Sequence, residues 1–148
     1  MMVELKENIL TAKVFLQLRE AAGWLIPTNQ QIEFGLKNSL VTISAVCENR
    51  IIGMGRLIGD GVLNCYIQDL IVYPEYRGKG IGTAIMEKLI AWAKDNGVSD
   101  TCMTVGLFAA KGKEEFYRKF GFVERPTKDG PQGPGMILQV RSTQKTSS

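Results

Sequence analysis

Six consecutive residues, Arg77-Gly78-Lys79-Gly80-Ile81-Gly82, constrain this chain more than any other feature of its sequence. They follow an apolar, strand-like segment, Leu63–Val72, and precede a segment with helical periodicity, Thr83–Lys94. A turn from a strand into a helix aims unpaired backbone N–H groups, and the positive end of the helix dipole, at one point. Phosphate binds well there, and glycine lets it approach the main chain because glycine has no Cβ. The sequence therefore predicts a phosphate-ligand site formed by Arg77, Gly78, Lys79, Gly80, Ile81, Gly82 and Thr83.

The spacing of residues in this turn differs from that of two known phosphate-binding motifs. A Walker loop needs Ser or Thr after its Gly-Lys pair, whereas Gly80 follows Lys79 here. A dinucleotide fingerprint needs its third glycine where Thr83 stands, and an early parallel unit that the chain lacks. A connector without a ligand is the remaining alternative. Three glycines in five positions cost much conformational entropy, which disfavours a mere connector.

The order of periodic segments indicates the fold class. The segments are two helices (Thr11–Ala22 and Thr28–Asn38), three antiparallel strands (Leu40–Val46, Ile51–Leu57 and Leu63–Val72), a helix (Thr83–Lys94), a strand (Thr101–Phe108), a short helix (Lys113–Phe120) and two strands (Phe122–Val123 and Met136–Val140). On the first helix, Val14, Leu18 and Ala21 form the expected apolar face. This order predicts a mixed α/β (α+β) fold rather than a doubly wound sheet.

Length and charge bound the class of protein. The 148 residues, 45% of them hydrophobic, fit one domain, which we expect to span residues 1–140 with a disordered polar tail at 141–148. Arg141 and Lys145 are two of the 18 basic residues, so residues 1–140 hold 16 basic against 15 acidic residues. Nucleic-acid binding needs a concentrated cationic face, so a nearly neutral domain argues against that function.

The remaining composition limits the chemistry and the compartment. The chain has no histidine, so imidazole serves neither as a base nor as a metal ligand, and we expect no metal site. Three widely spaced cysteines, Cys47, Cys65 and Cys102, are interpreted as reduced core thiols. No apolar run approaches the ~20 residues of a membrane span, and the first residues do not have the pattern of a signal peptide. We expect a cytoplasmic protein with no membrane partner.

Two blocks of the chain resemble one protein family. Asp69–Tyr76 followed by Arg77–Gly82 is similar to the acetyl-CoA signature of the GNAT superfamily, Arg/Gln-x-x-Gly-x-Gly/Ala, and Glu115–Phe122 is similar to that family's second signature. The resemblance covers roughly residues 40–140. It implies an acetyl-CoA-dependent N-acetyltransferase whose mostly antiparallel central sheet is flanked by helices. It further implies that the strands Leu63–Val72 and Thr101–Phe108 splay apart around the cofactor. Many members carry an asparagine one or two turns before the tyrosine of the second signature, and the stretch Ala109–Lys113 has none.

The resemblance also implies the roles of particular residues. Leu70, Ile71 and Val72 would offer main-chain groups to the pantetheine and the acetyl carbonyl, with an N–H near Val72 stabilising the oxyanion. Tyr117 would donate a proton to the leaving thiolate; the alternative is an aromatic packing residue with a polar tip.

Asp69 is the candidate acid or base that the residues themselves suggest. An amine with a pKa of ~10.4 must lose a proton before it attacks, and without histidine this leaves carboxylates or water. Asp69 lies in an apolar strand just before the predicted cofactor-binding main chain, which suggests a general base or a substrate-binding carboxylate. The alternatives are an ion-pair partner of Arg56 or another cation, and a solvent-facing strand position. Glu48 and Glu33 are further candidates.

The acceptor is left open by the sequence. A small amine, an amino-acid-like metabolite, an arylalkylamine, or a protein N-terminus or lysine all fit, and we expect the first two helices and the loop Thr127–Gly135 to select among them. A non-catalytic acyl-CoA sensor or interaction module on the same fold is the alternative function. Free sheet edges would also allow a homodimer.

Overall fold

A five-stranded sheet with its strands in chain order organises the first part of the molecule. The computed structural model describes residues 1–142. The strands are β1 (Glu4–Glu7), β2 (Val41–Cys47), β3 (Arg50–Gly59), β4 (Asn64–Val72) and β5 (Thr104–Gly106). Neighbours from β1 to β4 are antiparallel, whereas β4 and β5 are parallel. This arrangement confirms the predicted mixed, mostly antiparallel α/β fold.

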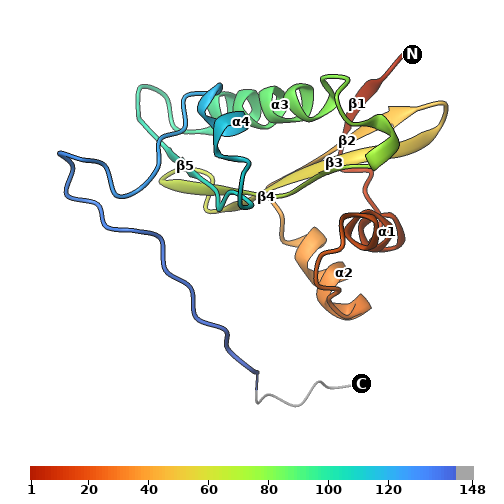
Figure 1. Cartoon of the computed structure of the whole chain (residues 1–148), viewed down its shortest axis with the longest axis horizontal. Helices are drawn as coiled ribbons and strands as arrows, with labels where there is room; N and C mark the ends of the chain where they lie inside the picture. Colours follow the sequence, from red (N-terminus) through yellow and green to blue (C-terminus); the bar gives the residue numbers. More distant parts are fainter. Residues whose placement is uncertain (143–148) are drawn as a thin grey trace. The chain divides into compact units, whose positions relative to one another are not determined.

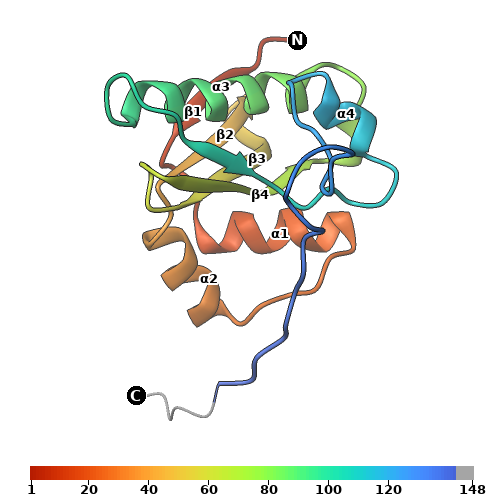
Figure 2. The same cartoon turned by 90° about the vertical axis from the view of Figure 1, so that its left-hand side faces the viewer.

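Helices cover both faces of this sheet. α3 (Ile81–Asn96) lies along one face, and α1 (Ala12–Ala22) and α2 (Asn29–Lys37) lie on the other (Figures 1 and 2). Five side chains of α3 are buried: Ile81, Ile85, Met86, Leu89 and Ala93. Gly55 of β3 lets α3 approach closely, because a Cβ there would lie 2.9 Å from Ile85 Cγ2. The core therefore sits between α3 and the sheet, with a second apolar layer under α1.

The helices on the opposite face have well-defined ends. Thr11 caps α1 by accepting a hydrogen bond from the N–H of Val14, and Gly23 ends the helix in a left-handed conformation. In α2, Thr28 and Gln31 form a capping box, in which each side chain accepts from the other residue's N–H. The buried residues of α1 are Phe15 and Leu18, so the predicted apolar face, which placed Val14 beside Leu18, is rotated by one position.

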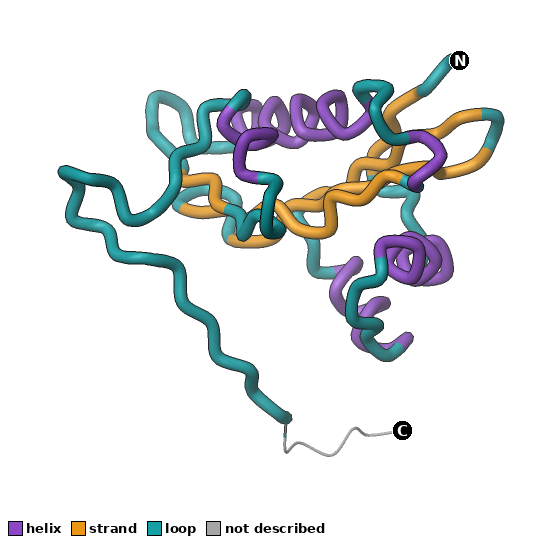
Figure 3. Tube along the Cα trace, in the orientation of Figure 1, coloured by secondary structure: helices purple, strands orange, loops and turns teal. Residues whose placement is uncertain are grey.

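The chain divides into two compact units, Met1–Leu107 and a second one that begins at Phe108. The sheet and the helices α1, α2 and α3 belong to the first, together with a single 3₁₀ turn, η1 (Pro74–Tyr76). The second unit holds α4 (Glu114–Arg118), followed by loop, which Figure 3 shows as a tube without strands up to the last described residues. Residues 143–148 of the predicted disordered tail lie outside the described residues.

Several predicted boundaries are wrong at the edges of the sheet. β1 is an additional strand, missed because its four residues, Glu-Leu-Lys-Glu, are mostly polar. The predicted strand Thr101–Phe108 shrinks to Thr104–Gly106, and Phe122–Val123 and Met136–Val140 are loop. Met136, Ile137, Leu138 and Val140 are exposed, and an apolar run without a ladder partner does not form a strand by itself. Of the three thiols, Cys47 and Cys65 are buried as predicted, but Cys102 is exposed.

Candidate functional site: a glycine turn beside an open strand edge

The glycine turn has the backbone conformation that its sequence predicts. Gly78 has φ 76° and Gly80 has φ 81°, both in the left-handed region that strains other residues. A Cβ built at either position would meet no atom within 4 Å, so conformation rather than crowding demands glycine. The main chain of the turn is therefore accessible from outside.

The start of α3 presents unpaired backbone donors. Gly80 is the N-cap residue and supplies no side-chain hydrogen bond, and the N–H of Ala84 donates to the carbonyl of Gly80 at 3.0 Å. The N–H groups of Ile81, Gly82 and Thr83 precede that bond, so they have no carbonyl four residues earlier within the helix. Since α3 is 16 residues long, its dipole adds a positive potential at the same point.

The two cations of the turn are placed differently. The side chain of Arg77 folds back so that its Nε donates to the carbonyl oxygen of Val72 at 3.1 Å. This contact ties the turn to the end of β4. Lys79 is exposed on the turn itself, where its ammonium group adds positive charge beside the helix start.

β4 has an open edge over its second half. It pairs with β5 only from Asn64, opposite Thr104, to Tyr66, opposite Gly106, and then continues to Val72. In the described part of the chain, residues 67–72 of β4 therefore have a strand neighbour only on the β3 side. This is the divergence of two strands that the family resemblance implies. Along the chain, this open edge is followed by η1 and then by the glycine turn.

The direction of the main-chain groups follows from the ladder. The N–H of Tyr73 donates to the carbonyl of Ile52, on the β3 side, at 2.9 Å. Since successive N–H groups of a strand point to opposite sides, the N–H of Val72 faces the open edge. The Val72 carbonyl, held by Arg77, lies on the same side. Val72 thus presents an N–H donor at the open edge, and its role as the oxyanion contact stays a prediction.

A β-bulge separates the two halves of β4. Arg56 pairs with Gln68 and Met54 with Ile71, so Asp69 and Leu70 together oppose the single residue Gly55. Asp69 has φ 56°, an uncommon conformation for a residue other than glycine. The bulge turns the Asp69 side chain toward α1 and re-aims the residues that follow it.

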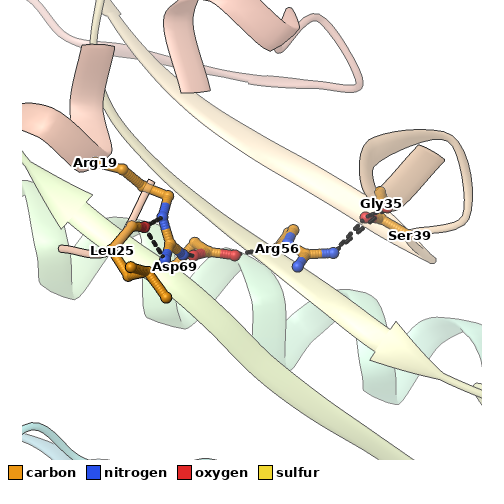
Figure 4. Close-up of polar contacts among 6 residues, drawn as sticks. All are labelled: Arg19, Leu25, Gly35, Ser39, Arg56 and Asp69. Atoms are coloured by element: carbon orange, nitrogen blue, oxygen red, sulfur yellow. Dashed lines mark hydrogen bonds and ion pairs between the residues drawn. The ribbon is translucent and has the colours of Figure 1, made fainter. Parts of the chain in front are cut away.

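Asp69 is held by two arginines from different elements (Figure 4). Its Oδ1 accepts from Arg19 Nη1 of α1 at 2.5 Å, and its Oδ2 accepts from Arg56 Nε of β3 at 2.7 Å. The Asp69 side chain is only 3% exposed, and each arginine side chain is 18% exposed. The ion-pair alternative for Asp69 is thus observed, and the role of general base stays a prediction.

The second arginine of this cluster was not found from the sequence. Arg19 lies on the buried side of α1, beside Phe15, and its guanidinium carbon is 5.6 Å from the centre of the Phe15 ring. Its Nε and Nη2 both donate to the carbonyl of Leu25, in the connection to α2. A cation on the apolar stripe of an amphipathic helix is the only signal that the sequence offers for such a residue.

Tyr117 belongs to the second unit and lies on α4. Its ring packs edge-on against Phe116 at 5.1 Å between centroids and against Phe122 at 6.3 Å. Burial raises the pKa of the Tyr117 phenol above its ordinary value of ~10, so the phenol keeps its proton at neutral pH. On the same helix, Arg118 pairs with Glu115 and Glu124.

Within residues 1–142, no group of three or more carboxylate or thiol side chains is arranged to hold a metal ion. None of the described helices combines the length and apolarity needed to cross a membrane.

Comparison with known proteins identifies the family. Residues 39–124 match the model of the "Acetyltransferase (GNAT) domain". A probable acetyltransferase from meticillin-resistant Staphylococcus aureus is 34% identical, with a TM-score of 0.80 over 94% of this chain and 100% of that one. A GNAT-family acetyltransferase from Streptococcus pneumoniae TIGR4 is 33% identical, with a TM-score of 0.77 over 95% of this chain and all of the other.

Curated N-acetyltransferases are similar to this chain over part of their own length. The "Uncharacterized N-acetyltransferase ycf52" of Porphyra purpurea is 32% identical over 79% of this chain and 66% of its own length. "Serotonin N-acetyltransferase 2, chloroplastic" of Oryza sativa subsp. japonica is 35% identical over 67% of this chain and 46% of its own length. This chain therefore aligns with only about two thirds, or about half, of these relatives. The fold is that of the two solved acetyltransferases. The chain belongs to the GNAT family of acetyltransferases.

The site fits the acetyl-CoA that this family implies. The bare N–H groups at the start of α3 and the Cβ-free turn suit a pyrophosphate, and the open edge of β4 suits a pantetheine arm. Arg77, Gly78, Lys79, Gly80, Ile81, Gly82 and Thr83 would hold the first, and Leu70, Ile71 and Val72 the second.

Replacing Asp69 by Asn tests the buried ion pairs. Within residues 1–142, Asp69 is the only carboxylate paired with either guanidinium group, so we expect the free energy of unfolding to fall by about 3 kcal/mol. Urea denaturation measures this change. The control is Glu75→Gln, which removes the exposed 3.8 Å pair with Arg50 and should cost less than about 1 kcal/mol. Equal effects of the two substitutions would show that the Asp69 pairs do not stabilise the fold.

Proposed function

We propose that this protein transfers the acetyl group of acetyl-CoA to a primary amine by direct attack within a ternary complex. The observation that carries the proposal is the continuity of the site: the unpaired edge of β4 runs into a glycine turn whose helix start has free N–H donors. Relatives support an amine acceptor, since one is named a serotonin N-acetyltransferase and another, from Glycine max, a histone acetyltransferase. The acceptor would thus be a small-molecule or a protein amine.

The main chain does most of the proposed binding. The N–H groups of Ile81, Gly82 and Thr83 would hold the pyrophosphate, assisted by Lys79. Bound acetyl-CoA would supply an activated thioester. The N–H of Val72, facing the open edge, would donate to the oxygen that gains negative charge as the amine attacks.

The two proton transfers are assigned to different groups. Tyr117 would give its phenolic proton to the leaving sulfur, and its raised pKa keeps that proton available at neutral pH. Both oxygens of Asp69 accept from arginines, which supports an orienting role for this carboxylate through the bulge. Because the chain has no histidine, the amine proton would then pass to water or to a carboxylate, for which Asp69 is the first candidate.

Gly80→Glu tests the phosphate site. A side chain and a negative charge at the helix start should weaken CoA binding by more than about tenfold, measured by calorimetry. Thiol release from acetyl-CoA with a panel of primary amines should fall in parallel. The control is Ala91→Glu, which adds the same charge on the exposed side of α3, well beyond its first turn. Thermal unfolding of both variants checks that they fold. Normal CoA affinity in folded Gly80→Glu would refute the assigned site.

Tyr117→Phe tests the proposed acid. We expect kcat to fall by about 10²-fold or more with unchanged CoA affinity, because only proton donation is lost. With the phenol pKa raised, wild-type activity should show no loss from Tyr117 ionisation between pH 7 and about 9. A non-catalytic acyl-CoA binder predicts no thiol release with any amine, and an identical response of wild type and variant.

A further inference from the structure

A cavity lies on the α1 and α2 face of the sheet, away from α3. Its volume is about 230 Å³, below the ~300–1,000 Å³ of sites that enclose a whole drug-sized ligand. The apolar part of its lining includes Phe15, Ile32 and Leu36, and the polar part includes Arg19, Arg56 and Gln31. A cavity of this size suits one end of a small molecule.

The ionised side chains at this cavity carry a net positive charge. Arg19 and Arg56 carry two positive charges, and Asp69, which binds both, carries one negative charge. The residues that line the cavity include no acid. Since both guanidinium groups are largely shielded from water, the excess charge is weakly screened. An anionic group entering the cavity would neutralise it, and a cationic group would be repelled.

The guanidinium groups of Arg19 and Arg56 have more N–H donors than their recorded hydrogen bonds use. A guanidinium group has five N–H donors. In Arg56, Nε donates to Asp69, and Nη1 donates to the carbonyl of Gly35 and the hydroxyl of Ser39, whereas the structure records no acceptor for Nη2 within residues 1–142. Asp69 and the carbonyl of Leu25 hold Arg19 in place, as Figure 4 shows. Such fixed, forked donors match a carboxylate well.

We propose that this cavity binds the carboxylate of the acceptor, so that the substrate class is an amine that also carries a carboxylate. The inference rests on the proposed transferase function. Position supports it, because Asp69 anchors both arginines and lies on the same strand as Val72, three residues before it. A small amino acid or short peptide could place its carboxylate at the arginines and its amine toward the open edge of β4. The apolar lining would contact the intervening carbon skeleton.

Matched acceptors and one pair of variants test this proposal. Gln31→Glu places a carboxylate on the cavity wall, and glutamate retains the capping box because its oxygen still accepts from the N–H of Thr28. Gln30→Glu adds the same charge at the preceding position of α2, which is exposed and does not line the cavity, and is the control. Each protein is assayed with amino acids, their carboxamides and the corresponding decarboxylated amines.

We expect wild type to prefer the carboxylate over the carboxamide by about tenfold or more in kcat/KM, as one charge-assisted contact allows. Gln31→Glu should abolish this preference through KM, and Gln30→Glu should retain it. Equal use of the three acceptor types by wild type, or equal behaviour of the two variants, would overturn the proposal.

Calorimetry separates this inference from the proposed function. The same acceptors are titrated into the CoA-bound protein. Carboxylate-dependent binding that Gln31→Glu abolishes, without any thiol release, would support the cavity and refute the transferase. Thiol release with amines that lack a carboxylate, and no carboxylate-dependent binding, would support the transferase and overturn the carboxylate site.

Discussion

The end of the β4–β5 ladder at Tyr66 is the constraint on which the site depends. Backbone N–H and carbonyl groups of a buried strand need partners, and beyond Tyr66 one side of β4 finds none in a neighbouring strand. Arg77 satisfies the Val72 carbonyl at this edge, and we propose that a ligand pairs with the remaining groups. After η1, the N–H groups at the start of α3 add further donors without a partner inside the helix. An extended molecule with a phosphate at one end is the ligand that these donors fit.

The bulge at Asp69 connects the open edge of β4 to the face of the sheet that α1 covers. An extra residue in β4 changes the direction of the strand, and the left-handed conformation of Asp69 costs free energy that its surroundings must offset. The two arginines provide that offset, since each forms a short, shielded ion pair with the carboxylate. One residue thus joins α1, β3 and β4 within the open edge of β4. Because Arg19 and Arg56 share the single negative charge of Asp69, the cavity beside Asp69 keeps one excess positive charge.

Local signals predicted the part of the site that depends on local conformation. The glycines at 78 and 80 indicated left-handed backbone, and the apolar periodicity after residue 83 indicated a long helix, so the turn and α3 appear where the sequence placed them. The antiparallel strands β2, β3 and β4 followed from alternation and turn residues in the same way.

Tertiary contacts account for what the sequence did not reveal. Arg19 and Asp69 are 50 residues apart, and no periodicity connects them. The β1 strand exists because β2 offers it a partner, and Met136–Val140 is loop although its composition favours a strand. Pairing of this kind depends on the whole chain, so propensity alone cannot fix it.

Backbone amide chemical shifts during a CoA titration test most directly whether the main chain forms the binding site. Using ¹⁵N-labelled protein, we expect the largest shifts at Ile81, Gly82 and Thr83 and at Val72, the donors that face the ligand. The exposed control position Ala91 should not move. Saturable CoA binding that left these four amides unperturbed, while shifting others, would contradict the proposed site.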